Sequence, residues 1–180
     1  MKNTIKLISV IVILALVASS ITACLSSGND EWQERFDKAV VKGKAKNVII
    51  RYAWSFSSQF PYEVKLERDK VASFVELFRD ISFSEFTDAD EIMKLSISAD
   101  PTYVVDFITG SKVSERDDAS AYDETGSRFE NAVQVRVVKS SGYVYLREAT
   151  GDAEKWYKSN ETVNVDKLLE YYGDAPRYED

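Results

Sequence analysis

Short runs in which apolar and polar residues alternate are the feature that most constrains the fold of this chain. A period of two places every second side chain on the same face of an extended strand. The runs predict strands over residues 47–56, 62–66, 93–98, 103–109, 112–115, 132–139 and 143–148. Short turns such as Gly110-Ser111 and Ser140-Ser141-Gly142 join several of them, so we expect neighbouring strands to pair as antiparallel hairpins.

Helical spacing of apolar residues marks three further segments, 30–41, 70–81 and 165–172. Asp69 is placed to cap the second segment, and Asn164 is placed to cap the third. Val163 and Leu168 suit a hydrophobic staple at this last helix, and Gly173 suits its end. The sequence therefore predicts an α+β fold, in which an antiparallel sheet of about five to seven strands carries roughly two or three helices on one face.

The start of the chain has the three parts of a bacterial secretory leader. Lys2 and Lys6 supply positive charge, residues 7–18 form an almost unbroken apolar run, and small and polar residues follow. The segment Ile21-Thr22-Ala23-Cys24 then resembles the lipobox of bacterial lipoproteins. That resemblance implies that a diacylglycerol is attached to the Cys24 thiol and that cleavage makes Cys24 the first residue.

The resemblance sets the expected organisation of the chain. Residues 1–23 are the signal peptide, 24–29 are the lipidated cysteine and a short tether, 30–173 are one globular domain and 174–180 are a tail. Two other interpretations of the leader stay open. It could be an uncleaved anchor helix, although the apolar run is at the short limit for spanning a membrane. It could also be an ordinary secretory signal with an incidental cysteine.

The composition after the leader excludes several classes of function. Removing residues 1–23 leaves 157 residues with 21 basic and 30 acidic side chains, a net charge of −9 that gives no electrostatic reason to bind nucleic acid or anionic headgroups. Cys24 is the only cysteine, so no disulfide can form within the chain. The chain has no histidine, which excludes histidine-based catalytic sites and nearly all transition-metal sites. We therefore expect no cofactor.

Two acidic groups were weighed as calcium sites, because clustered carboxylates supply the oxygen ligands that Ca²⁺ prefers. The first comprises Asp88, Asp90 and Glu91, and the second comprises Asp117, Asp118, Asp123 and Glu124. Neither spacing fits a calcium-binding loop. In the second group, aligning Gly126 with the glycine of an EF-hand leaves both key ligand positions occupied by alanine. Solvated loops are the preferred interpretation of both.

Aromatic residues near the end of the chain are the main candidates for a contact surface. These residues are Trp156, Tyr157, Tyr171 and Tyr172. Tyrosine and tryptophan serve both cores and interfaces, so burial in the core is the preferred interpretation and a contact surface is the alternative.

The sequence thus predicts a lipid-anchored protein on the extracytoplasmic side of a bacterial membrane. We expect a non-catalytic binding or accessory module with an envelope protein as its partner, because no recognisable catalytic set is present. The alternative is a binder of envelope glycans or solutes, or a histidine-free hydrolase that uses two carboxylates.

Overall fold

The computed structural model describes residues 31–53, 62–97, 100–116, 125–150 and 153–175. The chain divides into two units, Met1–Glu31 and Trp32–Asp180. The second unit contains the sheet and all the helices named below, apart from Glu31 at the start of the first helix. The leader, Cys24 and the tether lie outside the described residues.

The described elements are four α-helices, two short helical extensions and seven strands. The helices are α2 (Glu31–Phe36), continued by the π-helical turn η1 (Asp37–Val41), α3 (Arg68–Val75), continued by the 3-10 turn η2 (Glu76–Phe78), α4 (Ala89–Ile97) and α5 (Val165–Tyr172). The strands are β1 (Asn47–Ala53), β2 (Glu63–Lys65), β3 (Phe83–Phe86), β4 (Thr102–Ile108), β5 (Ala132–Val138), β6 (Tyr143–Thr150) and β7 (Ala153–Thr162).

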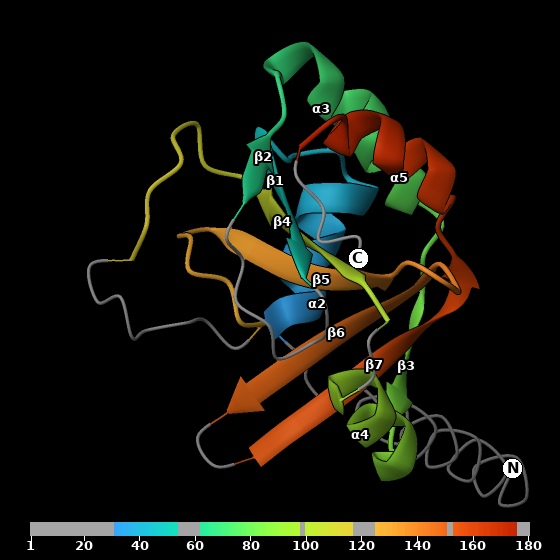
Figure 1. The fold of residues 1–180 in the computed structure, drawn as a ribbon. Coiled ribbons are helices and arrows are strands. Elements are labelled where there is room, and N and C mark those ends of the chain that lie inside the picture. Colours follow the sequence, from blue (N-terminus) through green and yellow to red (C-terminus); the bar gives the residue numbers. More distant parts are fainter. Residues whose placement is uncertain (1–30, 54–61, 98–99, 117–124, 151–152, 176–180) are drawn as a thin grey trace, which may run out of the picture. The chain divides into compact units, whose positions relative to one another are not determined.

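All seven strands form one sheet in the order β2-β1-β4-β5-β6-β7-β3 (Figure 1). Every pair of neighbouring strands is antiparallel. The predicted α+β class is therefore confirmed. The β1–β2 and β5–β6 hairpins are confirmed as well, with Ile50 opposite Val64 in the first and Val137 opposite Val144 in the second.

One face of the sheet carries the main core, under α2–η1, α3–η2 and α5. Phe107 of β4 lies at its centre and is fully buried. Its ring contacts Phe78 at 5.1 Å between centroids, Phe74 at 6.1 Å and Phe36 at 6.4 Å. These partners come from two helical segments far apart in the sequence, so Phe107 joins them to the middle of the sheet. Burial of large aromatic side chains dominates the energy of such a core.

The second face of the central strands is also buried, which the alternation did not predict. In β1, β4 and β5 nearly every residue is buried, whichever face its side chain points to. Arg51, Asp106 and Gln134 occupy positions that alternation assigns to solvent, yet each is at most 2% exposed. Residues 125–130 lie against this face, where Phe129 packs with Ile49 and Ile108.

Local signals located α5 and the β5–β6 turn correctly. The Asn164 side chain accepts a hydrogen bond from the Lys167 backbone N–H at 3.0 Å, as expected of an N-cap. The turn requires glycine at position 142, where φ is +72° and a Cβ atom would come within 2.6 Å of the Val163 carbonyl oxygen.

The predicted strand over residues 93–98 is wrong, because residues 93–97 belong to helix α4; Ser98 lies outside the described residues. The Asp88 carboxylate accepts a hydrogen bond from the Glu91 N–H at 3.0 Å, and the Ile92 N–H donates to the Asp88 carbonyl at 3.0 Å. Asp88 therefore begins a helix, and this local capping outweighs the alternation that follows it.

Two further predictions need correction, and two strands were missed. Residues 112–115 do not pair with β4, because β1 and β5 occupy both of its edges; Glu115 instead forms a β-bridge with Phe129. Asp69 does not cap α3, which begins at Arg68 after Glu67 without a side-chain cap. Strands β3 and β7 were not predicted, and they pair with each other at one edge of the sheet.

The helices do not all lie on one face. Glu91 of α4 contacts Tyr145 and Lys158, whose chain neighbours Val144, Leu146 and Tyr157 belong to the main core. Successive strand residues point to opposite faces, so α4 lies on the second face of the sheet. None of the helices in the described ranges is long and apolar enough to span a membrane.

Candidate functional site

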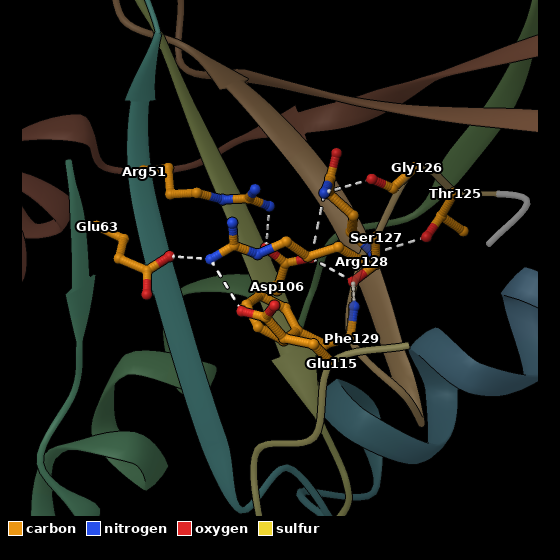
Figure 2. A network of polar contacts seen from close by, with 10 residues as sticks. Arg51, Glu63, Asp106, Glu115, Thr125, Gly126, Ser127, Arg128 and Phe129 are labelled. Atoms are coloured by element: carbon orange, nitrogen blue, oxygen red, sulfur yellow. Dashed lines mark hydrogen bonds and ion pairs between the residues drawn. The ribbon is translucent and has the colours of Figure 1, made fainter. Parts of the chain in front are cut away.

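The most organised polar group of the described structure surrounds Asp106 on the second face of the sheet (Figure 2). The Asp106 carboxylate is fully buried and forms an ion pair with Arg51. It also accepts hydrogen bonds from the Ser127 hydroxyl at 2.6 Å and from the Gln134 side-chain amide at 3.1 Å. A buried charge is tolerated only when it is paired and hydrogen-bonded, and Asp106 meets both conditions.

The same network fixes residues 125–129 against the sheet. The Gln134 side-chain amide also donates to the Gly126 carbonyl at 2.9 Å, and the Gln134 backbone N–H donates to the Thr125 hydroxyl at 3.0 Å. The Phe129 N–H donates to the Ser127 hydroxyl at 3.2 Å. The Gln134 side chain thus binds one end of this segment, while residues 114–116 bind the backbone of its other end through the Arg116 N–H to the Arg128 carbonyl and the Glu130 N–H to the Ser114 carbonyl.

Arg128 covers the outer side of this network. Its guanidinium donates to Glu63 at 2.6 Å, lies 3.4 Å from Glu115, and stands over the Phe129 ring at 4.9 Å from the centroid (Figure 2). These ion pairs are partly exposed, so each contributes little by itself. Through the ion pair with Glu63, however, Arg128 connects β2 to the segment that covers the sheet.

Positive charge gathers around Asp106 on the neighbouring strand positions. The pKa of Arg136 is lowered to about 10, chiefly by burial and also by the cations Arg147 and Arg51, while Asp106 and Glu154 oppose the shift. Arg136 remains protonated at neutral pH. Asp106 therefore offsets part of the positive charge of Arg51 and Arg136.

A second polar group holds α4 on the sheet. Glu91 accepts a hydrogen bond from the Tyr145 hydroxyl at 3.0 Å and an ion pair from Lys158 at 2.9 Å. Lys158 also lies over Tyr143, 4.6 Å from the ring centroid, and 5.3 Å from that of Phe86. Burial raises the pKa of Tyr145 to about 12, helped by the bond to Glu91. Burial alone would lower the pKa of Lys158, but its bonds to Glu91 and Tyr145 raise it.

The acidic residues of the first calcium candidate serve the fold. Asp88 caps α4, Glu91 binds Tyr145 and Lys158, and Asp90 is an exposed residue of the first helical turn. In the ranges that the structure describes, no group of three or more potential metal ligands occurs. The second candidate, Asp117, Asp118, Asp123 and Glu124, lies outside those ranges, as does Cys24.

The predicted aromatic contact surface is not assembled. Tyr157 and Tyr172 are buried in the main core, at 7% and 2% exposure, so the core interpretation is correct for them and the contact-surface alternative is wrong. Tyr171 is half-buried against Phe74, with ring centroids 5.1 Å apart. Trp156 is half-buried on the opposite face. Strand β7 was not predicted. Successive residues of a strand point to opposite faces, so Trp156 and Tyr157 lie on opposite faces of the sheet.

Sequence reasoning also missed an open, basic pocket of about 480 Å³ beside the start of β1. Its lining residues are Lys38, Lys44, Lys46, Thr109, Gly110 and Asn131. The signal was present in the sequence, since residues 38–46 contain four lysines and no acidic residue. The net negative charge of the chain concealed it. Three lysines line this one depression, and their charges make it a candidate site for an anion.

Comparisons of the chain with protein-family models, with curated proteins and with solved structures found no match. The function is therefore argued from the chain's own residues.

Replacing Asp106 with asparagine should destabilise the fold strongly. The substitution leaves Arg51 as a buried charge without its carboxylate, which costs about 3–5 kcal/mol. Denaturant unfolding followed by circular dichroism measures the change. The matched control is Glu76→Gln, which breaks an exposed pair with Arg79 and should cost less than about 1 kcal/mol. Equal losses in the two variants would contradict a structural role for Asp106.

The contact of Tyr145 with Glu91 can be tested by titration. A raised pKa means that the neutral phenol stabilises the fold below pH 10, and that this contribution is lost as the pH rises through about 12. Carbon NMR of ring-labelled tyrosine, assigned with Tyr145→Phe, should show this transition. Glu91→Gln should move it to lower pH, and Glu85→Gln should leave it in place. A Tyr145 transition near pH 10 in the native chain would refute the contact.

Proposed function

We propose that this protein is a lipid-anchored, non-catalytic binding module on the extracytoplasmic side of a bacterial membrane. The observation that carries the non-catalytic part is the closure of the Asp106 network. Its buried carboxylate is bound by Arg51, Ser127 and Gln134, and it holds a covering segment on the sheet. The most elaborate polar group of the described structure is therefore accounted for by folding.

The anchoring part rests on the sequence. The lipobox-like segment ends at Cys24, and Trp32, only 2% exposed, is the first buried residue of the folded unit. A fully extended tether of residues 25–29 would span less than about 20 Å. A lipid on Cys24 would therefore keep the folded unit close to the membrane surface, where an envelope protein can be its partner.

The two alternative functions have less support. A glycan-binding surface was expected from four aromatic residues, but Tyr157 and Tyr172 are core residues. A carboxylate hydrolase needs two carboxyl groups facing an accessible cleft. Asp106 is enclosed, and Glu91 is engaged with Tyr145 and Lys158.

Replacing Cys24 with alanine tests the proposal in cells that express the full chain. The variant should lose incorporation of labelled fatty acid and leave the membrane fraction, because it has no thiol to acylate. Ser26→Ala, two residues further on, is the matched control and should keep both. Crosslinking in the same cells should recover an envelope protein with the native chain and not with Cys24→Ala. Fatty-acid label on the Cys24→Ala variant would refute the anchor, and turnover of a substrate by the purified native chain would refute the non-catalytic role.

A further inference from the structure

Three of the four lysines in residues 38–46 converge on one pocket. Lys38 comes from η1, whereas Lys44 and Lys46 come from the connection to β1. The opposite wall is formed by Thr109 and Gly110 after β4, and by Asn131 before β5. Residues from three separate parts of the chain therefore surround a single basic depression.

The backbone beneath these lysines is held in place by hydrogen bonds. The Lys44 N–H donates to the Lys38 carbonyl at 3.1 Å, and the Lys46 N–H donates to the Ile108 carbonyl at 2.8 Å. Gly43, which has a φ of +59°, turns the chain between Lys38 and Lys44. On the opposite wall, the Asn47 side-chain amide donates to the Gly110 carbonyl at 2.9 Å. The three side chains are flexible, but the positions from which they extend are fixed.

The charge of the pocket is not balanced within the described structure. Across residues 31–53, 62–97, 100–116, 125–150 and 153–175, no ion pair joins Lys38, Lys44 or Lys46 to a carboxylate. Other cations in those ranges, such as Arg79 and Lys158, do have such partners. Like charges placed together without a counterion repel one another, and a bound anion would offset that repulsion.

We infer that this pocket binds a phosphate group. Lysine is a compact point charge with three donors, a common ligand for phosphate oxygens. The three positive charges more than offset the charge of about −1.5 to −2 that a phosphate monoester carries at pH 7. The side-chain amide of Asn131 adds a neutral donor at the rim. A pocket that is open to solvent suits a phosphate attached to a larger molecule.

An anionic phospholipid headgroup is the source that fits the proposed anchoring. This part of the inference rests on the proposed function, because a lipid on Cys24 would keep the folded unit at a membrane. A basic patch is a common additional attachment of lipid-anchored proteins to anionic membranes. Each lysine near an anionic surface strengthens binding roughly fivefold. Dissolved phosphate or a phosphorylated small molecule is the other source of the same chemistry.

The first experiment measures phosphate binding by the full chain without reference to its anchor. Calorimetric titration of the chain in a zwitterionic detergent with inorganic phosphate, at constant ionic strength, should show saturable binding. The variant Lys38→Gln/Lys44→Gln/Lys46→Gln should lose about tenfold or more in affinity. The control Lys65→Gln/Lys155→Gln/Lys167→Gln removes the same charge from three exposed lysines of β2, β7 and α5, and it should bind like the native chain. Circular dichroism checks that each variant is folded.

The second experiment identifies the source of the phosphate. The native chain should sediment more with vesicles that contain phosphatidylglycerol than with phosphatidylcholine alone, and only the pocket variant should lose this preference. The leader is common to all chains and cancels in the comparison. Phosphate binding without a vesicle preference would support the pocket and overturn the lipid headgroup as its source. No phosphate binding, or equal losses in both triple variants, would overturn the pocket. Loss of acylation in Cys24→Ala is a separate readout, so the anchor and the pocket can fail independently.

Discussion

The buried ion pair between Arg51 and Asp106 is the constraint on which the second face of this fold depends. Removing two charges from water costs several kcal/mol for each ion, and only a complete set of partners compensates. Ser127 and Gln134 complete the set at Asp106. Because Ser127 lies outside the sheet, satisfying Asp106 also brings residues 125–129 onto β4 and β5. The sheet thereby becomes covered on both faces, although only one face carries the large apolar core.

Much of the fold could be predicted from the sequence, because its signals are local. Asn164 and Gly142 specify a cap and a turn through contacts with residues close in the chain or through backbone conformation. The errors come from competition between signals. In residues 93–98 the alternation is outweighed by Asp88, whose carboxylate begins a helix. The prediction that residues 112–115 pair with β4 is wrong because β1 and β5 already occupy both edges of β4. A local sequence pattern cannot show which strands will be neighbours.

The candidate sites were harder to predict, because they depend on contacts between distant residues. Asp106 and Gln134 look like solvent-facing strand residues until the segment at Ser127 covers them. From the sequence alone Tyr157 is a candidate contact residue, whereas its position in strand β7 places its side chain in the main core. The lysine pocket was concealed for a different reason. Net charge is a property of the whole chain, whereas binding depends on how charge is distributed over the surface. An acidic protein can therefore carry a strongly basic pocket.

The most direct test of the central claim is native-state hydrogen exchange of two amides, the N–H groups of Phe129 and Gln134. Both donate to side-chain hydroxyls that belong to the segment at residues 125–129. If the Asp106 network fixes this segment as part of the fold, both amides should exchange only through global unfolding, at the same free energy as the Val105 amide of the central strand. Rapid exchange of Phe129 and Gln134 while Val105 stays protected would show that the segment opens independently, and would contradict the account.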